Sequence, residues 1–411
     1  MSKYYLGLDF GTSSAKAMVI DSDKNIILSL KTPSFPAQTP HYWQQALDQL
    51  FSQIPTEISQ NLEAIALDAT SSTMLLLDHD GELLADPLWY NNTNGKQYLQ
   101  EISELVPENH LVISATASLA KVYWWYRQGL TENASYILHQ ADWLGYLLHG
   151  QLGISDYHNA LKLGYDVESL SYPDWLQNLP FFSLLPEIKP PGAIIGHILP
   201  SIARKYHINP DCVIKAGTTD SIAAFLASGV KTAGEAVTSL GSTLVLKLLS
   251  NQKVDDSRYG VYSHRLGDLW LVGGASNTGG AVLRHFFSDD ELFSLSQKIN
   301  PDIPTNLNYY PLWGRGDRFP VNNPDFEPIL SPRPHDPVQF LQGLLEGIGA
   351  IESKGYQLLK TLGATPLTKV YTAGGGAKNE KWSMIREKYL QVPVLISPQT
   401  EAAYGSALLA C

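Results

Sequence analysis

The sequence predicts an α/β protein of two lobes, and three observations support this fold class. Residues 5–20 form an apolar strand, a turn of small hydroxyl residues and a second apolar strand. A similar strand–turn–strand arrangement recurs at residues 236–250, which suggests an internal duplication. The chain has 411 residues, of which 44% are hydrophobic, and this length favours two or more domains.

The first hairpin carries a candidate phosphate and metal site. Asp9 ends the first strand, and its carboxylate can hold a divalent metal through water. Gly11, Thr12 and Ser13 offer backbone N–H groups and hydroxyls to phosphate oxygens. A third strand at residues 26–29, rather than a helix, argues against a P-loop or a dinucleotide fold. Taken alone, the segment also fits an ordinary hairpin turn.

Two later segments complete a candidate site for a nucleoside triphosphate. Two such hairpins facing each other would place phosphate donors on both sides of a triphosphate, as phosphoryl transfer requires. Residues 370–379 form a strand that ends in three glycines, which allow close approach of a ligand such as adenosine. The expected ATP contacts beyond the first hairpin are Gly241, Ser242, Thr243, Gly280, Gly375, Gly376, Asn379 and Trp382, the last as a stacking face.

With these elements in order, the chain resembles the FGGY carbohydrate kinases of the actin-like ATPase superfamily, almost end to end. Asp9–Ser13 resembles the first phosphate loop of that family, Gly241–Thr243 the second, and Gly374–Ala377 the adenosine loop. The resemblance implies two ribonuclease-H-like lobes with mixed β-sheets flanked by helices. Each sheet would have three antiparallel strands extended by parallel strands, with the active site in the cleft between the lobes.

Residues 216–224 resemble the segment that carries the catalytic aspartate of the family, which makes Asp220 the expected general base. A sugar hydroxyl has a high pKa, so a positioned carboxylate must accept its proton as the phosphoryl group arrives. On local sequence alone, Asp220 could instead cap a helix. The resemblance also implies Mg²⁺ near Asp9 and Asp220, and sugar contacts from Asp9, Ser71 and Asp220.

The expected substrate is a small ketose. Within residues 87–93, family members often carry Trp-x-Asp-x-Arg, whereas Asn91 and Thr93 occupy the two charged positions here. At these two positions, hydrogen bonds from uncharged side chains would therefore replace charged contacts with the substrate. The chain is most similar to D-ribulose kinases of the family, with D-xylulose as the alternative substrate. A nucleotide-switched, sugar-sensing pseudokinase is the alternative from another functional class.

The expected lobes are a sugar-binding lobe at residues 1–228 and a nucleotide-binding lobe at residues 229–399, with a terminal helix at 400–411 returning to the first lobe. We also expect a helix near residues 43–58 and a long core helix from Pro337 to a stop at Gly363.

Composition excludes several functional classes. The net charge is −11 and no cluster of Lys and Arg stands out, so a nucleic-acid partner is not expected. No apolar run approaches the ~20 residues that span a membrane. Two cysteines provide neither a disulfide framework nor a thiolate metal site. Because residues 1–6 lead directly into the first strand, we expect a cytoplasmic protein.

Overall fold

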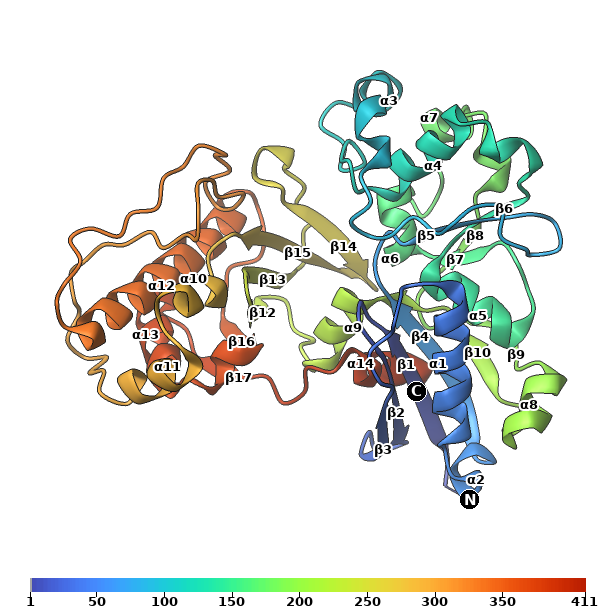
Figure 1. Ribbon diagram of the computed structural model, residues 1–411, viewed down its shortest axis with the longest axis horizontal. Coiled ribbons are helices and arrows are strands. Elements are labelled where there is room, and N and C mark those ends of the chain that lie inside the picture. The colour runs from blue at the N-terminus through green and yellow to red at the C-terminus, as the bar shows by residue number, and fades with distance from the viewer. Residues whose placement is uncertain (1) are drawn as a thin grey trace. The chain divides into compact units, whose positions relative to one another are not determined.

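The structure is a computed structural model that describes residues 2–411, and it divides into two compact units (Figure 1). The first lobe comprises the chain up to Ala227 together with Glu401–Cys411, and the second lobe comprises Ser228–Thr400. The first lobe is therefore discontinuous in sequence, because its last helix follows the whole of the second lobe.

A mixed sheet forms the centre of the first lobe. Its strand order is β3-β2-β1-β4-β10-β9, and β11 also pairs with β4. Strand β2 is antiparallel to both β1 and β3, whereas β4 runs parallel to β1 and β10 runs parallel to β4. The strands are β1 (Tyr4–Phe10), β2 (Ala15–Asp21), β3 (Ile26–Lys31), β4 (Leu62–Ala69), β9 (Ile194–His197), β10 (Val213–Lys215) and β11 (Thr218–Thr219).

Alternation of side chains along β1 and β4 separates the two faces of this sheet. Leu8 of β1 and Leu67 of β4 belong to a core shared with α1 (Pro40–Ser52) and α5 (Gln140–His149). The intervening positions face α14 (Ala402–Ala410), which contacts both strands. The other helices of this lobe are α2 (Thr56–Ser59), α3 (Leu99–Leu105), α4 (Ser118–Arg127), α6 (Tyr157–Ala160), α7 (Asp174–Gln177), α8 (Pro200–Tyr206) and α9 (Asp220–Ala227).

Helix α14 can approach the sheet and α9 closely because its buried residues are all small: Ala402, Ala403, Gly405, Ser406, Ala407 and Ala410. A Cβ atom at Gly405 would lie 1.8 Å from the carbonyl oxygen of Ala223 in α9. A Cβ atom at Gly7 of β1 would lie 2.0 Å from the carbonyl oxygen of Ala403. The close packing of α14 therefore requires glycine at position 405 in the helix and at position 7 in strand β1.

The prediction of a single helix near residues 43–58 is wrong, because the segment forms two helices. Helix α1 ends at Ser52, and the short helix α2 starts after Pro55. Proline has no N–H group and fits the start of a helix better than its interior, so the chain is divided at this residue.

A smaller apolar cluster supports the outer part of the first lobe. It includes residues of α4 and of the two-stranded sheet formed by β5 (Met74–Leu77) and β6 (Tyr136–His139). A second two-stranded sheet pairs β7 (Ile154–Asp156) with β8 (Glu187–Lys189).

The second lobe repeats the strand arrangement of the first. Its order is β14-β15-β13-β12-β16-β17, in which β15, β13 and β12 are antiparallel neighbours and β16 and β17 extend parallel to β12. The segment β15-β13-β12-β16-β17 therefore matches β3-β2-β1-β4-β10. The strands are β12 (Glu235–Leu240), β13 (Leu244–Ser250), β14 (Tyr262–Leu266), β15 (Leu269–Ser276), β16 (Lys369–Ala373) and β17 (Val394–Ile396).

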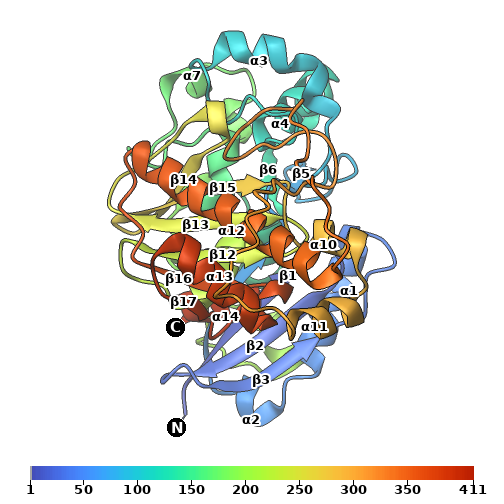
Figure 2. The ribbon, with the colours of Figure 1, turned by 90° about the vertical axis from the view of Figure 1, so that its left-hand side faces the viewer.

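The long helix α12 (Pro337–Thr361) packs against this second sheet (Figure 2). Asp336 caps its first turn and Gly363 lies just beyond its end, as the sequence predicts. Arg386 of α13 (Glu380–Leu390) is fully buried and donates to both carboxylate oxygens of Glu352, each at 2.7 Å. The remaining helices are α10 (Gly280–Phe286) and α11 (Asp289–Ser296).

Both lobes thus have the predicted α/β architecture of mixed sheets flanked by helices. Within residues 2–411, none of the helices combines the length and the apolar character needed to span a membrane.

Candidate functional site

Three carboxylates come together where parallel strands of the first lobe end. Asp9 of β1 is paired in register with Asp68 of β4, and Asp68 is paired with Thr218 of β11. Asp220 follows β11 directly as the first residue of α9. The carboxyl ends of parallel strands lie at one edge of a sheet, which is a common position for ligand sites in α/β proteins.

Burial and mutual repulsion raise the pKa values of two of these carboxylates, Asp9 and Asp68. Burial raises the pKa of Asp9 to about 6, and the charge of Asp220 adds to that rise, whereas Asp68 and Lys16 oppose it. The pKa of Asp68 is raised well above its usual value by burial and then by the charge of Asp9. Ser406 of α14 donates a hydrogen bond of 2.6 Å to Asp68 Oδ2. The site therefore favours a proton or a cation among its carboxylates.

Asp68 belongs to this acidic group, although the sequence analysis named only Ser71 from the same segment. It is fully buried, and its Oδ1 atom has no hydrogen-bond partner within the described chain. The usable signal was its position at the end of an apolar strand, in front of a turn rich in Ser and Thr. Its proximity to Asp9 depends on the parallel pairing of β1 with β4, which local sequence does not specify.

Asp220 is half-buried and lies at the start of α9. Its Oδ1 atom accepts a hydrogen bond of 2.6 Å from the backbone N–H of Ser221, so it does interact with the helix start. Two residues earlier, the hydroxyl of Thr218 lies 2.8 Å from Nδ1 of the buried His158. The backbone that leads into Asp220 is therefore anchored by a side chain from α6.

Ser71 lies in the turn between β4 and β5 and is partly exposed. The turn is held by hydrogen bonds around it. Thr70 Oγ1 lies 2.6 Å from Thr73 Oγ1 and donates to Gln140 Oε1 at 2.7 Å, and Thr73 Oγ1 accepts the backbone N–H of Tyr90 at 3.1 Å. The turn that carries Ser71 and the segment at residues 87–93 are thus joined by hydrogen bonds.

The first hairpin leaves its hydroxyls accessible. The N–H group of Gly11 donates to the carbonyl of Ser14 at 3.2 Å, which closes the turn between β1 and β2. Thr12 and Ser13 are exposed within that turn. The turn therefore offers polar groups beside Asp9 without a bulky side chain.

The predicted nucleotide segments of the second lobe meet at one end of its sheet. Gly241, Ser242 and Thr243 form the turn between β12 and β13. The N–H group of Gly280, the first residue of α10, donates to the carbonyl of Gly241 at 2.8 Å. A Cβ atom at Gly374 would lie 2.7 Å from the carbonyl oxygen of Leu240. The hairpin, the start of α10 and the triple-glycine segment are therefore neighbours.

The three consecutive glycines have different structural roles. Gly374 has φ of +83°, a conformation that residues with a side chain rarely adopt. A Cβ atom at Gly376 would lie 2.7 Å from both Leu240 and Trp382. Gly375 is exposed, and a Cβ atom there would meet no atom within 4 Å. The fold itself thus explains Gly374 and Gly376, whereas at Gly375 the space is open for a ligand.

The structure places Trp382 in the core rather than on an open face. Its exposed fraction is 2%, and its ring packs beneath Gly376 in the main apolar cluster of the second lobe. The expectation of a stacking face is therefore corrected to a packing role. Asn379 caps α13 by accepting the N–H group of Trp382 at 3.0 Å, and its Nδ2 atom donates to Ser296 at 2.8 Å.

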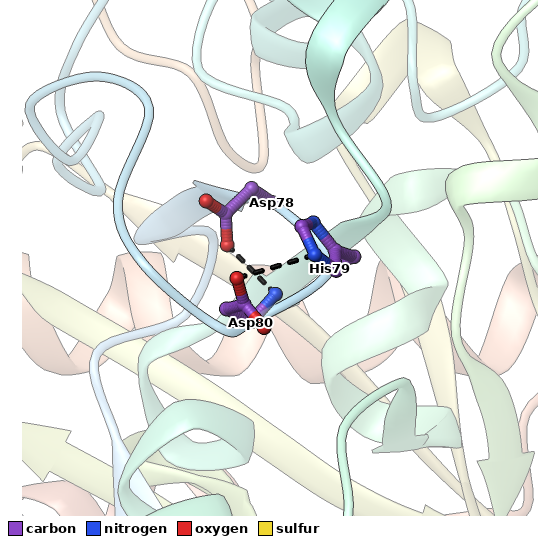
Figure 3. Close-up of side chains that lie close together, drawn as sticks. All are labelled: Asp78, His79 and Asp80. Atoms are coloured by element: carbon purple, nitrogen blue, oxygen red, sulfur yellow. Dashed lines mark hydrogen bonds and ion pairs between the residues drawn. The ribbon is translucent and has the colours of Figure 1, made fainter.

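One group of possible metal ligands lies elsewhere, in the turn after β5 (Figure 3). Asp78, His79 and Asp80 have ligand atoms within 4.8 Å of one another. However, Asp78 Oδ1 already accepts the backbone N–H groups of Asp80 and Glu82, each at 2.9 Å. This pattern is that of a turn closed by an aspartate side chain, so we assign the group to turn structure.

The carboxylates at the strand ends are a better match to a hard divalent cation. Mg²⁺ prefers oxygen ligands and retains much of its water, so one or two carboxylates suffice to hold it. Asp9 and Asp220 supply such oxygens, and the buried Oδ1 atom of Asp68, the residue paired with Asp9, has no hydrogen-bond partner within the described chain. When bound, the metal would neutralise phosphate charge.

Comparisons with known proteins agree with this arrangement. The N-terminal domain of the FGGY family of carbohydrate kinases matches residues 4–227, and the C-terminal domain matches residues 236–411. The xylulose kinase of Bacillus subtilis is 23% identical, covering 99% of this chain and 88% of that protein. The gluconokinase of the same organism is also 23% identical, covering 100% and 87% of the two chains.

Solved structures show the same fold. The gluconate kinase of Lactobacillus acidophilus superimposes with a TM-score of 0.86 at 18% identity, covering 100% of this chain and 89% of that one. The two lobes described above thus have the actin-like ATPase fold of such kinases. Because family domains match nearly the whole chain, the protein belongs to the FGGY family of carbohydrate kinases.

Proposed function

We propose that this ATP-dependent sugar kinase transfers the γ-phosphate of ATP to D-ribulose, giving D-ribulose 5-phosphate. The observation that carries the proposed chemistry is the position of Asp220, which starts α9 beside the strand-end carboxylates Asp9 and Asp68. A half-buried carboxylate at this point is accessible to a substrate hydroxyl and is held by the helix start.

In the proposed reaction, Asp220 accepts the proton of the sugar hydroxyl as the hydroxyl oxygen bonds to the γ-phosphorus. The bond from that phosphorus to the bridging oxygen breaks at the same time, and ADP leaves. Thr12 and the turn at 241–243 hold phosphate oxygens, and Gly375 with Gly376 borders the nucleotide. Asp9 and Asp220 would hold Mg²⁺, which would neutralise phosphate charge.

The choice of a neutral ketose depends on the segment at residues 87–93. Asn91 and Thr93 are both exposed and uncharged, at positions where family members often carry an acid and an arginine. A sugar acid such as gluconate would require a cation, whereas neutral amide and hydroxyl groups match the hydroxyls of a ketose. D-Xylulose is the second candidate, because xylulose kinases are among the relatives that match nearly the full chain.

The test is ADP release by the purified protein with Mg-ATP, alone and with D-ribulose, D-xylulose, L-ribulose, glycerol or gluconate. We expect D-ribulose to increase the rate at least tenfold, and mass spectrometry to detect the sugar monophosphate. Stimulation by D-xylulose alone would replace the substrate assignment. If ATP binds and no sugar changes the basal rate, the protein is a nucleotide-dependent sensor rather than a kinase for these substrates.

A further inference from the structure

A buried lysine without an acidic partner joins the two segments expected to contact the sugar. Lys121 of α4 is fully buried, with 0% of its surface exposed. Its Nζ atom donates to the backbone carbonyls of Ser72 at 2.5 Å, Trp89 at 2.5 Å and Tyr90 at 3.2 Å. Within residues 2–411, none of the ion pairs of this structure includes Lys121.

The three acceptors match the three N–H groups of an ammonium ion. Burying such a charge without a carboxylate is costly, and burial lowers the pKa of Lys121 to about 7, with a smaller contribution from Lys162. The hydrogen bonds to the three carbonyls offset part of this cost, and they connect two separate backbone segments through one side chain.

One of these carbonyls belongs to a residue with an unfavourable backbone conformation. Ser72 has φ of +63°, in the left-handed region that costs a residue with a side chain roughly 1–2 kcal/mol. Its hydroxyl is buried and has no hydrogen-bond partner within the described chain. A conformation of this kind persists only where the surroundings impose it. The bond from Lys121 to the Ser72 carbonyl is one such constraint.

The same ammonium also fixes the segment that follows. Trp89 packs edge-on against Trp43 of the core at a ring distance of 5.3 Å, whereas Tyr90 and the next residue are exposed. The hydrogen bonds to the Trp89 and Tyr90 carbonyls hold the chain where it leaves the core. Asn91 therefore starts from a fixed backbone position.

We propose that Lys121 is a positioning residue for the sugar site, holding the turn at 70–73 and the segment at 89–91 in the relative geometry that binds the ketose. This inference rests on the proposed function for the identity of the sugar. The hydrogen bonds of the Lys121 ammonium go to backbone carbonyls, and its effect on the substrate is exerted through Ser71 and Asn91.

The test uses the full-length Lys121→Met variant, which keeps an unbranched apolar side chain and removes the three N–H donors of the ammonium. We expect the KM for D-ribulose to rise at least tenfold, while the KM for ATP stays within twofold of the wild-type value. Val122→Ala is the matched control, because Val122 is equally buried and adjacent in α4. It should lower the melting temperature and leave the KM for D-ribulose within twofold.

Amide hydrogen exchange provides a second measurement that does not depend on turnover. Lys121→Met should increase exchange in peptides covering residues 71–74 and 88–92, and Val122→Ala should not increase it selectively there. If Lys121→Met does not fold, Lys121→Gln, which retains two N–H donors, is compared in the same way and should show smaller effects.

The outcomes separate this inference from the proposed function. Failure of the wild-type protein to use any sugar would contradict the proposed function, while exchange would still test whether Lys121 holds the two segments. Wild-type KM for D-ribulose together with wild-type exchange in a Lys121 variant would overturn the positioning role. A variant that raises the KM values for ATP and sugar equally would also overturn it.

Discussion

At the scale of single residues, this protein concentrates polar groups without partners near one edge of the first sheet. Asp68 Oδ1, Ser72 Oγ, Gln140 Nε2 and Thr219 Oγ1 are all buried and lack a hydrogen-bond partner within residues 2–411. Unsatisfied buried polar atoms cost roughly 1–3 kcal/mol each, and native proteins contain few of them. Two of them adjoin Asp220, because Thr219 precedes it in the chain and Asp68 interacts with its charge.

The first prediction concerns the proposed base. Asp220→Asn keeps the shape and the hydrogen-bond acceptor of the side chain but removes its basicity. We expect kcat to fall about 10²–10⁴-fold, the usual contribution of a general base, with ATP binding retained. Steady-state kinetics and nucleotide titration measure the two effects. The exposed Asp211 provides the control, since Asp211→Asn should leave kcat within twofold.

A second prediction follows from the raised pKa of Asp9. Because the pKa in the folded state is about 6, above the ordinary value of 3.8, folding favours the protonated form. Ionised Asp9 therefore destabilises the fold above pH 6, and this cost disappears as the pH falls below about 4. In the absence of Mg²⁺, Asp9→Asn should stabilise the protein by up to about 3 kcal/mol at pH 8.

Denaturant unfolding at several pH values measures this difference. The gain in the free energy of unfolding should shrink steadily as the pH falls from 6 to 4. A gain that stays constant over this range, or one that grows at acid pH, would show that ionisation of Asp9 is not its cause. Kinase activity of Asp9→Asn should be low at every pH, because the variant lacks the carboxylate assigned to the metal.

At the scale of elements, the strand ends and the turns next to them carry the candidate chemistry in both lobes. In the first lobe these are the ends of β1, β4 and β11, and in the second they are the ends of β12 and β16 with the start of α10. Loops at strand ends are held by the sheet, yet they leave backbone groups accessible. The repeated strand topology therefore gives each lobe the same type of accessible turn at its strand ends.

The triple-glycine segment after β16 permits a matched test of ligand contact against folding. Gly375→Val introduces a side chain where space is open, so the melting temperature should change little. If the nucleotide lies against this turn, the KM for ATP should rise at least tenfold while the KM for the sugar changes less than threefold. Unchanged ATP affinity in a folded Gly375→Val protein would remove the segment from the nucleotide site.

Gly374→Ala is the contrasting variant for the same segment. Its φ of +83° and the Leu240 carbonyl 2.7 Å from the new Cβ predict a loss of stability of about 1–3 kcal/mol. The two neighbouring variants therefore separate a folding role from a binding role. Thermal unfolding and ATP titration of both proteins complete the comparison.

At the scale of the whole molecule, the two lobes share one strand topology but differ in the segments of the chain that form them. The second lobe is a continuous segment, whereas the first requires the terminal helix α14. That helix packs on β1, β4 and α9, and Ser406 places a hydroxyl on the buried Asp68. The last ten residues of the chain thus stabilise the face of the sheet that carries the acidic site.

This dependence predicts a strong effect of a single substitution in α14. Gly405→Leu would force a side chain into the Ala223 carbonyl, which a Cβ atom alone approaches to 1.8 Å, and should lower the free energy of unfolding by at least about 3 kcal/mol. Chemical denaturation measures the loss. Cys411→Ser, at an exposed position in the same segment, should unfold like the wild-type protein.

Much of the fold followed from local pattern, and the exceptions have physical causes. The three opening strands, the second hairpin and the capped helix α12 were predictable because apolar alternation, turn residues and an Asp-Pro start act over a few residues. The division of α1 from α2 was missed although Pro55 marks it, since the apolar pattern continues through that residue. The prediction of a stacking face at Trp382 was wrong, because local sequence does not show whether an aromatic side chain near a glycine turn packs into the core or faces solvent.

The sequence by itself determined the family, the strand-ending carboxylate Asp9 and the candidate base Asp220, because these depend on short motifs in a characteristic order. Only the tertiary structure revealed that Asp68 lies beside Asp9, that Ser406 donates to it from the end of the chain, and that Lys121 holds the backbone of residues 72 and 89–90. Each of these contacts joins residues distant in sequence, so the pairing of strands and the packing of helices decide it.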